Sequence, residues 1–144
     1  MAKVELSREL SLSPQSAWEH ASNLNDLGDW LVMHEGWRSE VPGELSVGTT
    51  LVGVAGAKGM RNRVTWTVQK FEPPTLLEVT GKGVGGTKYG LKMKVKPTST
   101  GCAFAVVLDL GGAPLFGPIG AVAARAVKGD MERSIRRFEE LYVR

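Results

Sequence analysis

Cysteine and histidine are scarce in this sequence, and their scarcity excludes several kinds of site. The chain has 144 residues but only one cysteine, Cys102, and two histidines. A single cysteine forms no internal disulfide and supplies no thiolate zinc cluster. His20 and His34 are far apart in sequence and have no carboxylate at a ligand spacing, so they do not form a metal site. We therefore expect no metal ion and no other cofactor.

Long hydrophobic runs are missing as well. No stretch of about 18 apolar residues occurs, which is the length that a membrane-spanning helix requires. The N-terminus, MAKVELSREL, alternates charged and apolar residues, whereas a signal peptide has a basic segment followed by an apolar one. The sequence therefore predicts a cytoplasmic protein without a membrane span.

Familiar catalytic motifs are also absent. The chain has no GxSxG and no HExxH, and no cysteine and histidine flank a nucleophile, so no catalytic residue is predicted. Residues 81–86, GKGVGG, match the dinucleotide pattern GxGxxG, but that pattern requires a following helix. Residues 88–96 alternate like a strand instead. We interpret 81–86 as a glycine hairpin or a flexible loop.

What the sequence does hold is typical of one globular domain. Hydrophobic residues make up 42% of the chain and charged residues 23%, which is enough apolar material for a sizeable core. At about 150 residues per domain, the length predicts a single domain over 1–144. Glycine is frequent, with 18 residues and no repeating period, which favours strands and turns over a helical bundle.

Alternating polar and apolar residues predict most of the fold. Strands are expected at 3–12, 49–56, 62–71, 75–81, 87–96 and 102–110. Ser13 and Pro14 indicate the start of a short helix, and a second short helix is expected over 25–31, capped by Asn25 or Asp26. From 118 to 142, apolar residues recur at three- and four-residue steps, as in one long amphipathic helix. The pattern predicts an α+β architecture, in which a curved antiparallel sheet packs against a long C-terminal helix.

Basic residues gather on one predicted strand. Lys88, Lys92, Lys94 and Lys96 share one face of it, whereas Tyr89 points to the other face. Proteins that bind single-stranded nucleic acids place aromatic side chains among the basic ones, so that bases can stack. We therefore interpret the lysines as a solvated face and expect no nucleic-acid partner.

Aromatic residues and methionines indicate an internal cavity. The set comprises Trp18, Trp30, Met33, Trp37, Met60, Trp66, Tyr89, Met93, Phe104 and Phe116. Each residue alone is compatible with an ordinary core position. A strongly curved sheet around a single helix, however, leaves more space on its concave side than one helix face can fill. Together these residues predict an apolar cavity with few polar groups.

Four local blocks of sequence carry a resemblance to a known family. They are 34–39 (HEGWRS), 58–66 (KGMRNRVTW), 83–88 (GVGGTK) and 111–120 (GGAPLFGPIG). The order of elements resembles the helix-grip (SRPBCC) superfamily of START lipid-transfer domains, birch-pollen-allergen-like proteins and polyketide cyclase/dehydrases. Within it, the blocks are similar to an actinobacterial family, some of whose members are known as the toxin of a type II toxin–antitoxin pair.

The resemblance implies a sheet of six or seven strands around the C-terminal helix, with a cavity for a hydrophobic ligand such as a lipid, a sterol or a polyketide-like molecule. We expect binding without catalysis, and the expected partners are this ligand and an antitoxin protein. Residues 83–86 and 30–37 would form the mouth of the cavity. The expected lining residues are Trp30, Met33, His34, Trp37, Trp66, Val79, Tyr89, Leu91, Met93, Phe104, Val106, Phe116, Ile119, Ala123 and Val127.

Two alternative functions remain open. In a polyketide aromatase/cyclase-type enzyme, His34 and Tyr89 would serve as acid/base and orienting groups; with Arg8, they are the only polar candidates for the cavity. In a protein-interaction module, an antitoxin would cover the apolar segment 115–119.

Two glycines interrupt the predicted long helix. Gly120 and Gly129 each make a helix less stable than alanine would, by about 1 kcal/mol. We therefore expect them to let the helix approach the sheet or to leave room for a ligand.

Overall fold

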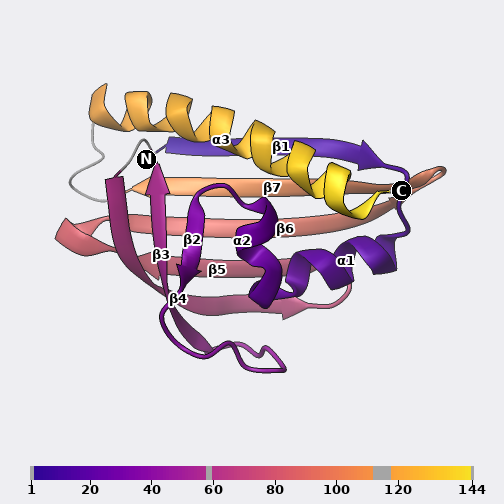
Figure 1. Ribbon diagram of the computed structural model, residues 1–144, viewed down its shortest axis with the longest axis horizontal. Coiled ribbons are helices and arrows are strands. Elements are labelled where there is room, and N and C mark those ends of the chain that lie inside the picture. Colours follow the sequence, from indigo (N-terminus) through magenta and orange to yellow (C-terminus); the bar gives the residue numbers. More distant parts are fainter. Residues whose placement is uncertain (1, 58–59, 112–117, 144) are drawn as a thin grey trace.

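The chain folds into a seven-stranded sheet with one long helix across it (Figure 1). The computed structural model describes residues 2–57, 60–111 and 118–143. In chain order the elements are β1 (Ala2–Leu10), α1 (Pro14–Ser22), the 3-10 helix η1 (Leu24–Asp26), α2 (Leu27–Trp30), β2 (His34–Trp37), β3 (Thr50–Ala57), β4 (Met60–Glu72), β5 (Leu76–Lys82), the 3-10 helix η2 (Val84–Gly86), β6 (Lys88–Thr98), β7 (Gly101–Gly111) and α3 (Pro118–Tyr142). The six predicted strands, the long helix and the α+β helix-grip architecture are confirmed.

The sheet is antiparallel throughout and runs in the order β1-β7-β6-β5-β4-β3-β2. Strands that follow one another in sequence therefore pair from β2 to β7, whereas β1 pairs with β7, and β1 and β2 form the two edges. The helices α1 and α2 connect these edges and lie at one side of the sheet (Figure 1). Hairpins of this kind let a curved sheet enclose the space beneath α3.

Two local predictions differ from the structure. The alternation of residues does not predict β2, a strand of four residues that pairs with β3 across an irregularity between His34 and Gly36. Such a bulge disrupts the regular alternation. The short helix predicted over 25–31 is α2, which is shorter than predicted because the 3-10 helix η1 occupies the start of the segment. Asp26, one of the two predicted caps, stands at the N-cap position of α2 but makes no side-chain capping hydrogen bond. The side chain of Asn23 caps η1 instead, accepting a hydrogen bond from the Asn25 backbone N–H.

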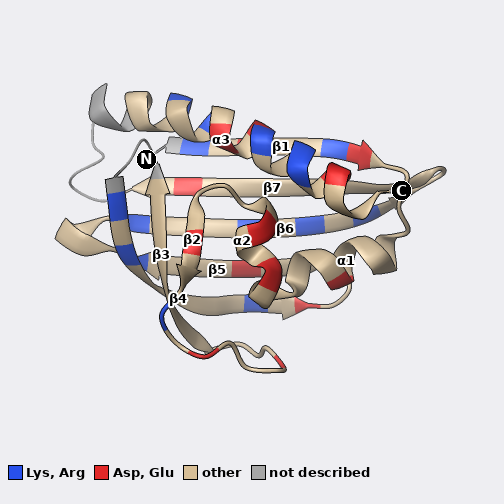
Figure 2. Ribbon diagram, in the orientation of Figure 1, with Lys and Arg blue, Asp and Glu red and all other residues tan. Residues whose placement is uncertain are grey.

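Strand β6 divides apolar and basic residues between its two faces, as its alternation predicts. Leu91, Met93 and Val95 are buried in the core. On the opposite face, Lys92 lies 3.7 Å from the carboxylate of Glu78 on β5. Figure 2 shows that basic residues are spread over β4, β6 and α3.

The long helix α3 packs against the sheet in two different ways along its length. Its C-terminal half carries large side chains, and Phe138 packs on Phe104 and Trp30 with ring centroids 4.5 and 5.1 Å apart. Its N-terminal half presents small side chains, including Ala123 and Ala126, to the interior. The C-terminal half therefore closes the core, whereas the N-terminal half leaves space between helix and sheet.

Polar contacts attach the C-terminal half of α3 to the rest of the fold. The Ser134 hydroxyl accepts a hydrogen bond from the Val32 backbone N–H at 2.9 Å. Near the end of the helix, Glu139 forms an ion pair of 3.1 Å with Arg8 of β1. These contacts fix the end of the helix that the aromatic cluster already holds.

The structure contradicts the expectation for Gly129. A Cβ atom added there would meet only a guanidinium nitrogen of Arg133, at an ordinary 3.7 Å, so this glycine is not needed for a close approach to the sheet. It is also absent from the described wall of the cavity beneath the helix, so it does not leave room for a ligand there. The side-chain surroundings of Gly120 lie outside the described residues.

We predict that Gly129→Ala stabilises the protein by about 0.5–1 kcal/mol, because alanine loses less conformational freedom in a helix than glycine does. Urea unfolding would measure the change. The opposite result is expected for Gly81→Ala, where a Cβ would meet Val64 Cγ1 at 2.5 Å and Trp66 Cε3 at 2.8 Å. A destabilised Gly129→Ala variant would contradict this account of the helix.

Candidate ligand cavity

A cavity of about 780 Å³ lies between the sheet and the N-terminal half of α3. This volume is within the range of pockets that hold small molecules, roughly 300–1,000 Å³. Ten of the expected lining residues lie on its wall: Met33, His34, Trp37, Trp66, Val79, Tyr89, Leu91, Met93, Ala123 and Val127. Half of them come from β4, β5 and β6, where the alternation of the strands points their side chains to the same face of the sheet: Trp66, Val79, Tyr89, Leu91 and Met93.

Five other expected lining residues do not contribute to the described wall. Trp30, Phe104 and Val106 are buried in the closed core, and Trp30 is 0% exposed between Phe104 and Phe138. For these three the expectation is wrong, because they are absent from the described wall; Trp30 and Phe104 pack on Phe138 of α3 instead. Phe116 lies outside the described residues, as does the side chain of Ile119.

Three exposed side chains mark where the cavity opens. Val84 of η2 is 70% exposed, Val122 of α3 is 59% exposed, and the side chain of Arg61 on β4 is 73% exposed, yet all three line the cavity. The opening therefore lies between η2, α3 and β4. The expected mouth at 83–86 agrees with the position of Val84. Of the expected segment 30–37, Glu35 pairs with Arg61 at the opening, whereas Trp30 is fully buried.

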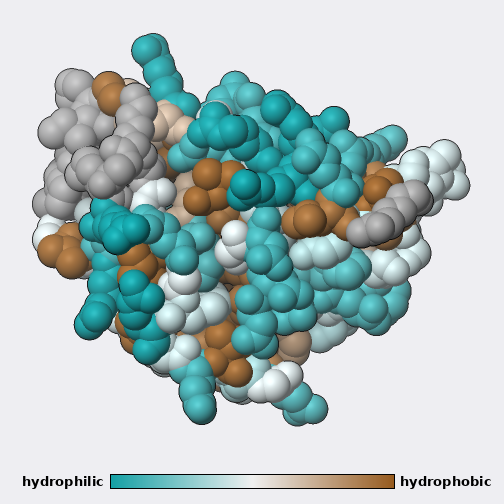
Figure 3. Space-filling view, in the orientation of Figure 1, coloured by the Kyte–Doolittle hydropathy of each residue, from teal (hydrophilic) through white to brown (hydrophobic). Residues whose placement is uncertain are grey.

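The surface that carries α3 is mostly hydrophilic. In Figure 3, hydrophobic residues appear on this face only in separate places among hydrophilic ones, as far as the described residues show. The apolar segment 115–119, expected as a protein-binding patch, lies outside the part of the chain whose side chains the structure describes.

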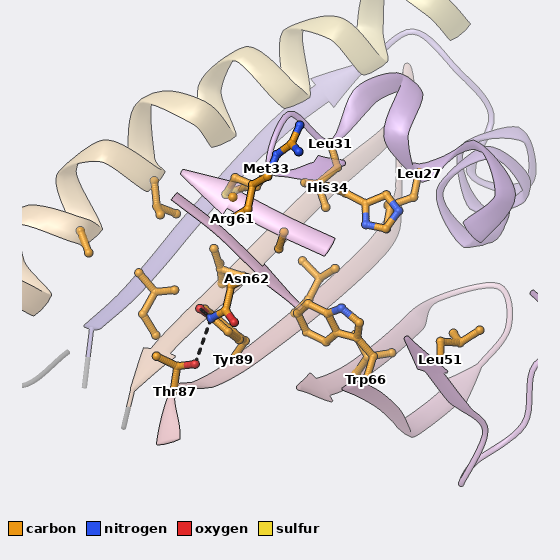
Figure 4. A pocket seen from close by; sticks show the side chains of 18 of the residues that line it. Leu27, Leu31, Met33, His34, Leu51, Arg61, Asn62, Trp66, Thr87 and Tyr89 are labelled. Atoms are coloured by element: carbon orange, nitrogen blue, oxygen red, sulfur yellow. Dashed lines mark hydrogen bonds between the residues drawn. The ribbon is translucent and has the colours of Figure 1, made fainter. Parts of the chain in front are cut away.

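A cluster of hydrogen bonds lies at one side of the cavity. The Asn62 side chain accepts a hydrogen bond from the Val84 backbone N–H at 2.9 Å. Its amide nitrogen donates to Thr87 Oγ1 at 3.2 Å and to the Tyr89 hydroxyl at 2.8 Å. Figure 4 shows Asn62, Thr87 and Tyr89 together, apart from His34, which lies beside Leu27. The cluster joins β4, η2 and β6.

A glycine makes this cluster possible. A Cβ at Gly83 would overlap Thr87 Oγ1 and would lie only 2.6 Å from the Asn62 amide nitrogen. No other residue leaves space for both side chains at this position.

The cluster matches no catalytic motif, but the alternation of the strands indicates it. Asn62 stands in the same alternating register as Val64 and Trp66, and Thr87 in the same register as Tyr89 and Leu91. A polar residue at an inward position of a strand is costly unless it finds hydrogen-bond partners. Such positions therefore indicate a polar site within an apolar wall.

His34 is buried on the cavity wall. It is 7% exposed, its ring centroid lies 4.4 Å from that of Trp37, and its Nε2 is buried without a hydrogen-bond partner among the described residues. Burial lowers the pKa of His34 from 6.5 to about 4. The imidazole is therefore neutral at pH 7.

The two arginines near the site form ion pairs. Arg8, expected as a polar group of the cavity, pairs with Glu139 instead and is absent from the described wall. Arg61 lies at the opening, and its Nε is 2.8 Å from a carboxylate oxygen of Glu35. Within 2–57, 60–111 and 118–143, no group of three or more His, Cys, Asp or Glu side chains has the arrangement of a metal site, and no helix is long and apolar enough to cross a membrane.

We predict that the pH dependence of stability contains a contribution from His34. Above about pH 7, His34 is mostly unprotonated in both the folded and the unfolded chain. As the pH falls from about 6.5 towards 4, the unfolded chain binds a proton at this residue, whereas the folded chain does not. The free energy of unfolding should therefore fall over this range. Urea unfolding at a series of pH values should show a flatter dependence for His34→Gln.

The matched control is His20→Gln, at the other histidine, which packs on Tyr142 outside the cavity. This variant should keep the pH dependence of the wild type. Parallel curves for the wild type and His34→Gln would show that burial does not keep the imidazole neutral.

Comparison with known proteins identifies the family. Residues 1–142 match the family described as "Polyketide cyclase / dehydrase and lipid transport". An uncharacterized protein of Mycobacterium tuberculosis, Rv1546, is 58% identical over 142 residues, which are 99% of each chain. A second protein of the same organism, named Toxin Rv0910, is 39% identical over 142 residues, again 99% of each chain.

Solved structures share the fold at low sequence identity. TTHA0849 from Thermus thermophilus superposes with a TM-score of 0.77 at 19% identity, covering 96% of this chain and 95% of that one. A START superfamily protein from Mycobacterium smegmatis gives a TM-score of 0.75 at 15% identity, covering 97% and 96%. The family match over nearly the whole chain confirms the resemblance carried by the local sequence blocks, and the chain belongs to the polyketide cyclase/dehydrase and lipid transport family.

Proposed function

We propose that this protein binds a hydrophobic small molecule, lipid-like or polyketide-like, in the cavity beneath α3, and releases it chemically unchanged. The observation that carries the proposal is the cavity of about 780 Å³, whose described wall is mostly aliphatic, aromatic or thioether. Transfer of an apolar ligand from water to such a wall is favourable, at about 25 cal/mol per Å² of apolar surface buried. The family description names both polyketide chemistry and lipid transport.

The arrangement of the polar groups favours binding over catalysis. A general acid and a general base must both reach the reacting molecule. The Nε2 atom of His34 is buried, while the Tyr89 hydroxyl lies with Asn62 at another part of the wall (Figure 4). This separation argues against the aromatase/cyclase alternative, in which both groups would act on one ligand.

We predict that the uncharged dye N-phenyl-1-naphthylamine binds the protein, with a fluorescence increase that saturates as protein is added. Filling the cavity with Ala123→Phe/Ala126→Phe should weaken binding by about tenfold or more, because both alanines line it from α3. The control Ala121→Phe changes an exposed residue of the same helix and should leave binding unchanged. Equal binding by all three proteins would show that the dye does not enter this cavity.

A second proposed function is growth inhibition, with an antitoxin as partner. It is supported by the relative named Toxin, which is 39% identical over 99% of this chain. The two functions are compatible, since a protein that sequesters a hydrophobic metabolite can slow growth through that binding.

We predict that induced expression in a mycobacterial host slows growth, and that co-expression of a short reading frame beside this gene restores it. Growth curves would measure both effects. The Ala123→Phe/Ala126→Phe variant should be less inhibitory if inhibition depends on the cavity, with Ala121→Phe again as the control. Unchanged growth under expression of the wild type would exclude the toxin proposal.

A further inference from the structure

The hydrogen bonds around Asn62 fix which way its amide points. The Val84 backbone N–H donates to Asn62 Oδ1 at 2.9 Å, so this atom must be the oxygen. The amide nitrogen is therefore the atom that faces Thr87 and Tyr89, and its two protons go to Thr87 Oγ1 and to the Tyr89 hydroxyl oxygen. Asn62 has no proton left for a ligand.

The remaining hydroxyl protons differ in their use. Thr87 Oγ1 donates its proton to the Val84 carbonyl oxygen at 3.0 Å. The Tyr89 hydroxyl accepts from Asn62 but donates to no acceptor among the described residues. Of the three side chains in the cluster, only Tyr89 thus has a donor proton that no described acceptor takes.

The position of Tyr89 gives this donor access to a bound molecule. Tyr89 is half-buried and lines the cavity. Its ring centroid is 6.1 Å from that of Trp66, which lines the same cavity (Figure 4). A ligand in contact with Trp66 would therefore lie beside the Tyr89 side chain.

The charges of the wall indicate an uncharged ligand. Arg61 is the one cationic side chain on the described wall, and Glu35 already neutralises it at 2.8 Å. His34 is neutral at pH 7, because burial lowers its pKa to about 4. A carboxylate inside this cavity would lose its hydration without gaining an unpaired cation.

We propose that the cavity selects an uncharged apolar molecule with a carbonyl-type oxygen, which accepts a hydrogen bond from the Tyr89 hydroxyl. Asn62 is the positioning residue, because its amide N–H donates to the oxygen of that hydroxyl. The hydroxyl proton must therefore point away from Asn62. This inference rests on the proposed function, since it names the ligand class of the same cavity.

The test compares two probes of nearly equal shape, 2-acetylnaphthalene and 2-isopropenylnaphthalene, in which a CH2 group replaces the carbonyl oxygen, so that only the first has an oxygen acceptor. Each is titrated against bound N-phenyl-1-naphthylamine. Tyr89→Phe should weaken binding of the ketone by about 2- to 10-fold, the range for loss of one hydrogen bond, and should leave the hydrocarbon unchanged. Tyr142→Phe, at the other tyrosine, is the matched control and should change neither.

A second variant tests the positioning role of Asn62. In Asn62→Asp, the carboxylate can accept the Tyr89 proton, so the donor is no longer available to a ligand. The ketone should again lose affinity while the hydrocarbon keeps it, which also shows that the cavity is intact. Asn25→Asp, at an exposed position of η1, is the control.

A third probe, 2-naphthoate, tests the charge of the ligand and should bind more weakly than the ketone. Tighter binding of 2-naphthoate would overturn the assignment of an uncharged ligand. If Tyr89→Phe affects the ketone and the hydrocarbon equally, the Tyr89 contact is wrong but the cavity remains a binding site. If the wild type binds none of the probes or the dye, the proposed function fails, and this inference fails with it.

Discussion

The change in side-chain size along α3 is the constraint on which the rest of the structure depends. Where Phe138 meets Trp30 and Phe104, aromatic rings fill the space between helix and sheet. Where Ala123 and Ala126 line the space between helix and sheet, a cavity of about 780 Å³ remains. Unfilled space forfeits the dispersion contacts that a dense core provides. The aromatic end, with the contacts of Ser134 and Glu139, therefore supplies large-side-chain packing and polar contacts that hold the helix on the sheet.

The curvature of the sheet and the helix together explain which parts of the site could be predicted. Inward positions of β4, β5 and β6 follow from alternation alone, which is why Trp66, Val79 and Met93 were expected on the wall and are found there. Alternation predicts the face of the sheet to which a side chain points, but it does not predict which half of α3 lies over that side chain. Phe104 and Val106 share the inward face of β7 with the lining residues Leu108 and Leu110, yet Phe104 packs on Phe138 in the C-terminal half of α3, and Val106 is absent from the described wall.

The parts that sequence did not predict have local physical reasons. Strand β2 is short, and an irregularity in its pairing with β3 removes the alternation that would have indicated it. Asn62 and Thr87 are not among the predicted lining residues, because polar side chains on strands usually face the solvent. Their register with Trp66 and Tyr89 places them on the cavity wall instead, where Asn62 is half-buried and Thr87 is buried. A hydrogen-bonded polar cluster of this kind adds specificity to an otherwise apolar surface.

Two polar side chains of the wall, His34 and Tyr89, show how such a surface can discriminate between ligands. Burial keeps His34 neutral at pH 7 and conceals its Nε2, so it contributes shape rather than charge. The Tyr89 hydroxyl oxygen accepts a hydrogen bond from the Asn62 amide, and the hydroxyl donates to no acceptor among the described residues. An apolar wall alone distinguishes molecules weakly, by size and shape, whereas one oriented donor penalises any ligand that leaves it unpaired. Under the proposed function, a cavity with one such donor and no unpaired charge on its described wall prefers one class of hydrophobic molecule.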